Sequence, residues 1–448
     1  MKRNRPECIE GEYMAMKTMR NLMMGIALTC LCAGAGNAAE APAATPHWWK
    51  GDDFSWVRGA NYIPSYAIND VEQWLDYQPE VVERELELAT RLRLNSVRVW
   101  LQYFAYETDR EKFLANYEDF ITRCAKYGIR PMFVLFDGCF GADPAIGVPG
   151  WVANPGPIRM QKEYWPKLEK YVDDVVGKHV GDPRILFWDV MNEPSSLGAP
   201  AILGAPDAAY TFAQAFCAYV RKIDNTHPAT IGVGNHRDIP RILDDVDVVT
   251  FHSYQVFEKT FEMDIAAARK ANKDKAMLIT EVTTNEMGQE PEMTFRVMRE
   301  NKIGWYFWHL VMGKLPLTVR SAFDTNGTTY CPDVIASVLG FTVPHALHTP
   351  RMDRFSIGKL PDEVVAQPTT DETYADRHAA AFEWGRSMAW AGIELPKEIY
   401  ARTGEAEQLL AAGKKTEAYA LFDQNVKALA EVARQHGVFD ELKAEPKP

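Results

Sequence analysis

Short apolar runs alternate with longer amphipathic stretches from about Trp48 to Pro344. Apolar runs of four to eight residues are typical of strands that are buried on both faces, and amphipathic stretches are typical of the helices that cover such a sheet. The expected strands are Val57–Tyr62, Ser96–Leu101, Arg130–Phe136, Ile185–Val190, Thr230–Val233, Val246–Phe251, Ala276–Thr280 and Gly304–Trp308. Helical patterns lie between them, among others at Pro79–Leu92, Phe113–Tyr127, Trp165–His179 and Tyr210–Ile223. The alternation predicts a parallel sheet with crossover helices.

The number of strand–helix units distinguishes two parallel-sheet folds. Eight units in roughly 260 residues match the size of a (β/α)₈ barrel. The alternative, a doubly wound open sheet, normally carries a glycine-rich phosphate turn after its first strand. Gly232 and Gly234 lack the third glycine of that turn and follow the fifth expected strand. We therefore predict an α/β fold, a (β/α)₈ TIM barrel over residues 48–344.

The pattern changes after Pro344. A loop-like, proline-containing segment is followed by two stretches rich in Ala, Glu and Lys, Asp371–Ala391 and Pro396–Leu442, which we expect to be helical. Gly413 lies at the expected turn of a helical hairpin. We predict a C-terminal loop and helical extension over residues 345–448. It either packs on the barrel or forms an arm that binds a partner.

The N-terminus has the pattern of a targeting segment. Lys17 and Arg20 precede an apolar run that is too short for a membrane span, and small residues after it offer a signal-peptidase site near Ala38 or Ala39. We predict a signal peptide over residues 1–39, with Met16 as a possible alternative start, and an Ala/Pro-rich linker over residues 40–47. The protein is then secreted or periplasmic. A lipoprotein is the alternative, because Cys30 and Cys32 lie in the apolar run.

The amino-acid composition limits the classes of ligand and partner that the protein is expected to bind. Aromatic residues make up 11% of the chain, including 12 Trp and 18 Tyr, which suits stacking on sugar rings, although core packing accounts for most of them. The net charge of −12 and the lack of a basic stripe argue against nucleic acid. The four cysteines after the leader are widely spaced and show neither a disulfide framework nor a metal site, so buried free thiols are as well supported as disulfides. We predict no cofactor and no metal, and the oligomeric state stays open.

Polar residues follow one expected strand after another. In a barrel of this kind the active site lies at the carboxyl ends of the strands, so these residues would face a common cleft. A single such residue is usually a cap or faces solvent, but a ring of them indicates a site. The ring consists of Arg98 and Trp100 from the second strand, Asp137 after the third, Asn192 and Glu193 after the fourth, His252 and Tyr254 after the sixth, Glu281 after the seventh, and Trp308 and His309 at the eighth.

Two carboxylates of the ring suggest the chemistry. Glu193 and Glu281 follow the fourth and seventh strands, and opposite sectors of a barrel would place them across the cleft. Glycoside hydrolysis needs one carboxylic acid that protonates the leaving oxygen and one carboxylate, and in retaining enzymes this carboxylate attacks the sugar. As the acid, Glu193 is expected to have a raised pKa, because of partial burial and nearby negative charge.

The neighbouring residues fit this chemistry. Asn192 could hydrogen-bond a sugar 2-hydroxyl, and Tyr254 could donate to Glu281 and keep it ionised. The positive charge of Arg98 favours the ionised nucleophile as well. Trp308 could form an apolar floor beneath the sugar. Alone, each of these motifs is more often a helix start, a cap or a core residue, so their order and strand spacing carry the prediction.

These residues resemble clan A glycoside hydrolases, and most closely glycoside hydrolase family 5, the cellulase/mannanase family. The resemblance runs from about Arg58 to Asp333. It rests on the segments Arg58-Gly-Ala-Asn-Tyr, Asn95-Ser-Val-Arg-Val-Trp, Trp188-Asp-Val-Met-Asn-Glu-Pro, Phe251-His-Ser-Tyr, Ile279-Thr-Glu and Trp305-Tyr-Phe-Trp-His.

The resemblance implies a retaining mechanism with Glu193 as acid/base and Glu281 as nucleophile. It also places Arg98, Asn192, His252, Tyr254 and Trp308 in the subsite next to the cleavage point. One position departs from the family, which often has His after the third strand. Asp137 stands there instead and is expected to bind a sugar hydroxyl, so the chain is placed in a divergent bacterial branch.

The expected function is hydrolysis of O-glycosidic bonds in plant-type β-glycans or their oligosaccharides. The alternatives on the same site are β-mannosidase, β-xylanase or transglycosylase activity. An alternative from another class is a carbohydrate-binding barrel without catalysis, against which both carboxylates argue. Metal-dependent and serine hydrolysis have no support, because the sequence contains neither an HExxH motif nor a GxSxG motif.

Overall fold

The computed structural model describes residues 47–139, 144–195, 207–272, 274–282, 289–315, 318, 321–342 and 361–440. The expected signal peptide, nearly all of the expected linker, and Cys30 and Cys32 lie outside the described residues. None of the described helices is long and apolar enough to cross a membrane.

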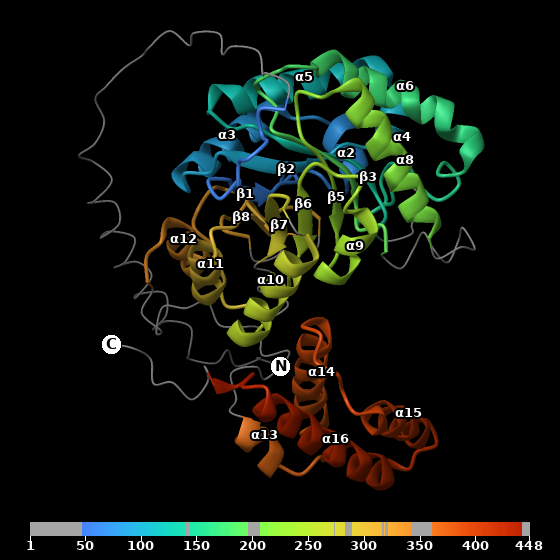
Figure 1. Ribbon diagram of the computed structural model, residues 1–448, viewed down its shortest axis with the longest axis vertical. Coiled ribbons are helices and arrows are strands. Elements are labelled where there is room, and N and C mark those ends of the chain that lie inside the picture. The colour runs from blue at the N-terminus through green and yellow to red at the C-terminus, as the bar shows by residue number, and fades with distance from the viewer. Residues whose placement is uncertain are drawn as a thin grey trace, which may run out of the picture. The chain divides into compact units, whose positions relative to one another are not determined.

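Eight parallel strands form a closed barrel, in which each strand pairs with the next along the chain and β8 pairs with β1 (Figure 1). The strands are β1 (Arg58–Asn61), β2 (Ser96–Trp100), β3 (Met132–Asp137), β4 (Phe187–Asn192), β5 (Ala229–Val233), β6 (Val249–His252), β7 (Met277–Val282) and β8 (Gly304–Phe307). The predicted TIM barrel is confirmed. The strand ends differ from the prediction by a few residues, and one difference matters for the site: β7 continues to Val282, so Glu281 lies within the strand.

Helices follow the strands and cover the outside of the barrel (Figure 1). The four helical patterns predicted above appear as α3 (Pro79–Arg91), α5 (Arg110–Lys126), α6 (Trp165–Val175) and α8 (Ala208–Ile223). The other helices of this part are α2 (Asp70–Leu75), α4 (Tyr103–Thr108), α9 (Ile239–Ile242), α10 (Glu258–Asn272), α11 (Pro291–Glu300) and α12 (Pro332–Leu339). Their apolar residues pack against the barrel strands in one large buried cluster.

Local sequence explains where these helices begin. In α11, Pro291 occupies the first turn, where its missing N–H costs nothing. The side chain of Glu290 accepts hydrogen bonds from the backbone N–H groups of Glu292 and Met293, which satisfies two donors that a helix start leaves free.

The barrel interior changes from apolar to polar along the strands. Its amino end is filled by a cluster that includes Phe54, Phe187, Leu278 and Tyr306. Tyr306 lies against Gly59, where a Cβ atom would fall 2.2 Å from the ring, so this layer requires glycine. Toward the carboxyl ends the pairing register shifts in β4/β5, β6/β7 and β7/β8. Such irregularities re-aim side chains, and here they occur beside the predicted site residues.

The C-terminal helices have a core of their own. They are α13 (Pro361–Ala366), α14 (Tyr374–Trp390), α15 (Lys397–Ala411) and α16 (Lys415–Gln435). Gly413, with φ of 75°, forms the expected turn between α15 and α16. Their buried residues form a cluster that also contains Val256 and Phe257, from the segment between β6 and α10.

The cysteine alternatives are resolved within the described residues. Cys124, Cys139, Cys217 and Cys331 are all buried, and Cys124 and Cys217 are free thiols. Burial raises the pKa of the Cys124 thiol well above its usual range, as expected for a thiol in apolar surroundings.

Candidate active site

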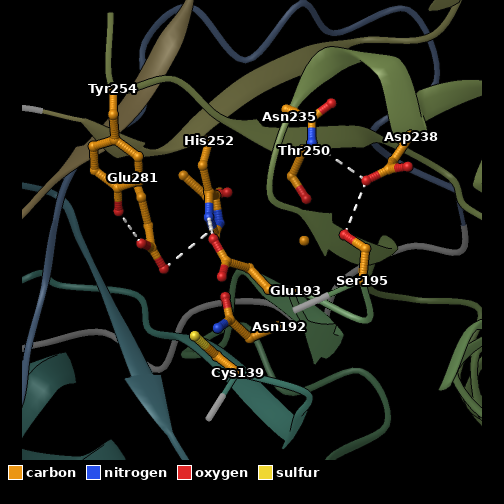
Figure 2. Close-up of polar contacts among 12 residues, drawn as sticks. Cys139, Asn192, Glu193, Ser195, Asn235, Asp238, Thr250, His252, Tyr254 and Glu281 are labelled. Atoms are coloured by element: carbon orange, nitrogen blue, oxygen red, sulfur yellow. Dashed lines mark hydrogen bonds and ion pairs between the residues drawn. The ribbon is translucent and has the colours of Figure 1, made fainter. Parts of the chain in front are cut away.

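The polar ring predicted from the sequence meets at the carboxyl end of the barrel. Its residues lie on or directly after six of the strands, and hydrogen bonds among them join β2, β3, β4, β6 and β7. Figure 2 shows His252 between the two glutamates, with the phenol of Tyr254 directed at Glu281. Seven members of the ring therefore form one network of polar contacts: Arg98, Asp137, Asn192, Glu193, His252, Tyr254 and Glu281.

Arg98 is the centre of this network. Its side chain is 0% exposed, and it donates to Asp189 Oδ2 from both Nε (2.9 Å) and Nη2 (2.8 Å). It also donates to Glu281 Oε1 (2.7 Å) and to Asn192 Oδ1 (2.7 Å). Burial alone would lower the pKa of Arg98, but the charges of Asp189 and Glu281 raise it above its usual range. A cation with this many fixed partners holds its neighbours in one geometry.

Glu281 receives a donor on each carboxylate oxygen. Arg98 donates to Oε1, and the phenol of Tyr254 donates to Oε2. Burial, together with the charges of Glu281 and Glu193, raises the pKa of Tyr254 well above its usual range. The phenol therefore stays protonated and acts as a donor. With a buried cation and a phenol fixed on it, Glu281 is held as an oriented carboxylate.

Glu193 has a different setting. It is the first residue after β4 and has φ of 43°, in the left-handed region that a non-glycine residue rarely adopts. Its side chain keeps 19% exposure, and Oε1 lies 2.6 Å from His252 Nδ1. Gly234 lies opposite, where a Cβ atom would fall 3.3 Å from Oε1. A strained, partly open position of this kind is common at functional sites.

The pKa of Glu193 corrects one expectation. Burial raises it, as the sequence suggested, but the hydrogen bond and charge of His252 outweigh that effect, with help from Cys139 and Arg98. The net pKa of Glu193 lies below its ordinary value. The expectation from the sequence assumed negative charge near Glu193, whereas its nearest ionisable partner is the imidazole of His252.

Asp137 is a buried residue whose carboxylate contacts three neighbouring groups of the protein. It is 1% exposed, and its carboxylate accepts hydrogen bonds from Asn192 Nδ2 (3.2 Å), Trp151 Nε1 (2.8 Å) and the backbone N–H of Cys139 (2.6 Å). Burial raises its pKa well above the usual range. With both oxygens engaged, Asp137 is placed to orient Asn192 and Trp151. Contact of Asp137 with a sugar hydroxyl stays a prediction. The geometry does not favour it, because both carboxylate oxygens already accept hydrogen bonds from the protein.

The tryptophans separate into two roles. Trp100 is fully buried, and the guanidinium of Arg98 lies 4.6 Å from its ring centroid. Trp308 and Trp151 are only partly buried and pack on it, with ring centroids 5.7 Å and 5.0 Å away. Trp100 thus supports the other two rings, which remain accessible. His309, at the end of the ring, has its pKa lowered to about 3 by burial, and its Nε2 accepts from the backbone of Ile63.

Three residues around Arg98 were not predicted from the sequence. Asp189 is the buried partner of Arg98, and Asn61 accepts from Arg98 Nη1 at 3.1 Å. Both lie inside the quoted family segments. Asp189 lies in the middle of β4, and Asn61 ends β1 but lies one residue before the end of the strand expected from the sequence. Gly232 is the third: a Cβ atom there would fall 2.9 Å from Asp189 and 3.1 Å from Arg98. A lone glycine in a strand signals such close approach.

One group of donors has the composition of a metal site. Glu193, His252 and Glu281 each offer one atom, and these atoms lie within 4.8 Å of one another. However, the guanidinium of Arg98 already occupies Oε1 of Glu281 with a positive charge. A cation there would be repelled, so the residues fit a pair of carboxylates bridged by an imidazole better than they fit a metal.

Comparison with solved structures finds several proteins that are similar to this chain. Exo-beta-1,4-mannosidase Op5Man5 from Opitutaceae bacterium strain TAV5 has a TM-score of 0.50 at 15% identity, over 63% of this chain and 58% of that chain. A GH5_18 from Bifidobacterium longum subsp. infantis has a TM-score of 0.48 at 17% identity, over 63% and 77%. The endo-1,4-beta-mannanase from Rhizomucor miehei has a TM-score of 0.46 at 15% identity, over 63% and 96%. At the 15% identity of the mannosidase, the likeness concerns the fold alone.

Sequence comparison reaches the family. No curated protein matches the chain. The family model described as Cellulase (glycosyl hydrolase family 5) matches residues 66–312, which contain strands β2 to β8 and both glutamates. Because this match covers more than half of the sequence, the chain belongs to glycosyl hydrolase family 5.

Proposed function

We propose that this protein is a retaining β-glycosidase that hydrolyses O-glycosidic bonds in plant-type β-glycans or their oligosaccharides. One observation carries the proposal: an oxygen of Glu193 and an oxygen of Glu281 lie within 4.8 Å of each other. Retaining enzymes hold their carboxyl groups about 5–5.5 Å apart, whereas inverting enzymes need about 6.5–9.5 Å to admit a water. The separation supports double displacement.

In the first step Glu281 attacks the anomeric carbon, and the bond to the leaving oxygen breaks. Glu193 gives its proton to that oxygen, which departs as an alcohol and leaves a glycosyl ester on Glu281. Arg98 and Tyr254 orient the nucleophile, with one donor on each of its oxygens. Asn192, fixed by Arg98 and Asp137, would donate its second amide hydrogen to the 2-hydroxyl of the sugar.

In the second step the roles of Glu193 reverse. It removes a proton from water, the water oxygen attacks the anomeric carbon, and Glu281 leaves as a carboxylate. The low pKa of Glu193 suits this base step. It makes the acid step depend on pH, because the fraction of protonated Glu193 falls as the pH rises through that pKa. We therefore expect optimal activity at acidic pH.

The test is a hydrolysis screen on mannan, xylan, glucan and aryl glycosides, with the product anomer followed by NMR. We expect the wild type to release the retained anomer first and Glu281→Ala to be inactive. Equal rates for both proteins would refute catalysis at this site, and first release of the inverted anomer would refute double displacement. The same panel separates β-mannosidase and β-xylanase activity, and added acceptor sugars reveal transglycosylation.

A non-catalytic carbohydrate-binding barrel remains the alternative from another class. It predicts substrate binding by calorimetry, without hydrolysis of any substrate in the panel. The donors on Glu281 argue against it, because binding alone gives no reason to bury a guanidinium against a carboxylate.

We also propose that the protein is exported to the periplasm or secreted. The support is the basic, apolar and small-residue pattern of residues 1–39. Expression of the full chain in a Gram-negative host, followed by N-terminal sequencing, tests this. A mature N-terminus near Ala39 is expected, and an uncleaved cytoplasmic product would refute it.

A further inference from the structure

The segment between β6 and α10 carries the partners of both carboxylates. His252 contacts Glu193, and two residues later Tyr254 donates to Glu281. A shift of this short segment would therefore disturb the acid/base and the nucleophile together. The contacts that hold the backbone of this segment in place therefore affect the active site.

The barrel anchors one side of the segment through α10. Asp264, which is 2% exposed, accepts from Ser253 Oγ at 2.8 Å and from Gln255 Nε2 at 3.1 Å. Ser253 and Gln255 flank Tyr254. Their side chains are thus fixed, but these two bonds leave the carbonyl of Tyr254 itself without a barrel partner among the described residues.

The C-terminal helices anchor the other side. Arg386 of α14 donates from Nη2 to the backbone carbonyl of Tyr254 at 3.3 Å. Its side chain is 7% exposed, and it is held by a hydrogen bond from Nε to Glu383 (3.0 Å) and by the ring of Trp390, whose centroid lies 4.4 Å from the guanidinium. Contacts within α14 therefore fix the guanidinium that donates to Tyr254.

Apolar contacts continue the same attachment. Phe257, just after the segment, packs edge-on against Phe439 with ring centroids 5.5 Å apart, and Phe439 packs against Trp384 at 5.1 Å. Val256 belongs to this cluster as well. Residues 253–257 thus make contacts both with α10 and with the C-terminal helices.

The contacts of Arg386 within its own helix account for only part of its guanidinium. Its Nη1 is buried without a hydrogen-bond partner among the described residues, which costs free energy that an apolar side chain would avoid. Apart from its partner Glu383, the hydrogen bond of Arg386 goes to Tyr254, outside its own helix. The hydrogen bond to Tyr254 therefore accounts for a guanidinium at this buried position.

We propose that Arg386 is a positioning residue for the catalytic pair: it fixes the backbone of Tyr254 and, through it, the donor on Glu281. On this basis the C-terminal helices are part of the active-site structure and not a separate partner-binding arm. The inference rests on the proposed function only for its kinetic readout.

The test compares Arg386→Met with Arg402→Met in the full chain. Arg402 of α15 donates to Asn425 of α16 at 2.7 Å and makes a matched change inside the same helices. We expect Arg386→Met to lower kcat about tenfold with KM changed by less than about twofold, and Arg402→Met to keep wild-type kcat. Equal kcat values for the two variants would overturn the proposal. If Arg386→Met does not fold, Arg386→Lys replaces it with the same expectation.

A double-mutant cycle with Tyr254→Phe separates positioning from general destabilisation. If Arg386 acts through Tyr254, Arg386→Met costs less than about threefold in the Tyr254→Phe background. Additive losses would overturn the proposal. Hydrogen exchange of residues 252–257 gives a readout without activity: faster exchange in Arg386→Met than in Arg402→Met is expected, and equal exchange contradicts the anchor. An inactive wild type with this exchange difference would refute the proposed function alone.

Discussion

The two glutamates of the site share a chemical group but have opposite surroundings. Glu281 lies inside β7, with one donor on each oxygen, one of them from an arginine that is completely buried. Glu193 lies just beyond β4, in a left-handed backbone conformation, with an exposed fraction of 19% and an imidazole as its partner. The first is held in one orientation by fixed donors, whereas the second is partly open to a ligand or solvent.

This difference assigns the two roles more firmly than the identity of the residues does. A nucleophile benefits from a constant charge and direction, and buried fixed donors provide both. An acid/base must give a proton in one step and take it back in the next, so it needs access to the leaving group and to water. If the assignment is right, variants on the two sides of the site should fail in different ways.

The largest difference is expected for Glu193→Ala. Loss of the acid should slow substrates with poor leaving groups by about 10²–10⁴-fold, whereas activated aryl glycosides need little protonation and should be affected far less in their first step. Steady-state kinetics across a series of leaving-group pKa values measures this. Uniform slowing across the series would contradict the acid/base role.

Arg98→Met is expected to damage both stability and activity. It leaves the buried carboxylate of Asp189 without its cation, a change that typically costs about 3–5 kcal/mol in the free energy of unfolding. Denaturant unfolding measures it. Asp189→Asn in the same chain removes the uncompensated charge, so the double variant should regain part of the stability but not the activity. Full stability of the single variant would show that the network does not hold this side of the site.

Tyr254→Phe should leave the fold intact and weaken the nucleophile. Loss of one hydrogen bond to a charged group corresponds to about 1.5–3 kcal/mol, or roughly 10–100-fold in kcat/KM. The loss should be similar for good and poor leaving groups, in contrast to Glu193→Ala. A loss confined to poor leaving groups would place Tyr254 on the acid side instead.

The smallest effect is a shift along the pH axis. His252 lowers the pKa of Glu193, so His252→Leu should raise that pKa. The protonated acid then persists to higher pH, and the alkaline limb of kcat/KM should move upward. Tyr254→Phe keeps the contact between His252 and Glu193 and serves as the control, with an unchanged alkaline limb. An alkaline limb that does not move in His252→Leu would show that another group titrates there.

Much of this arrangement was readable from the order of residues along the chain. The barrel followed from eight buried runs and their amphipathic partners, because parallel strands and crossover helices have distinct hydrophobic periods. The ring of site residues followed from the rule that a barrel presents the ends of its strands to one cleft. His252, Tyr254 and Glu281 were found in this way, each at or just after the expected end of a strand and without any knowledge of distances.

The tertiary structure decided what each polar group meets. Asp189 and Asn61 point inward from the middle or end of their strands, and only closure of the barrel brings them to Arg98. The pKa of Glu193 depended on His252, 59 positions away in the chain. Sequence determined the strands, their order and the residues at their ends, because these follow from local periodicity. Electrostatics and the contact of Arg386 with Tyr254 depend on distances of a few ångströms between distant segments, which only the folded barrel sets.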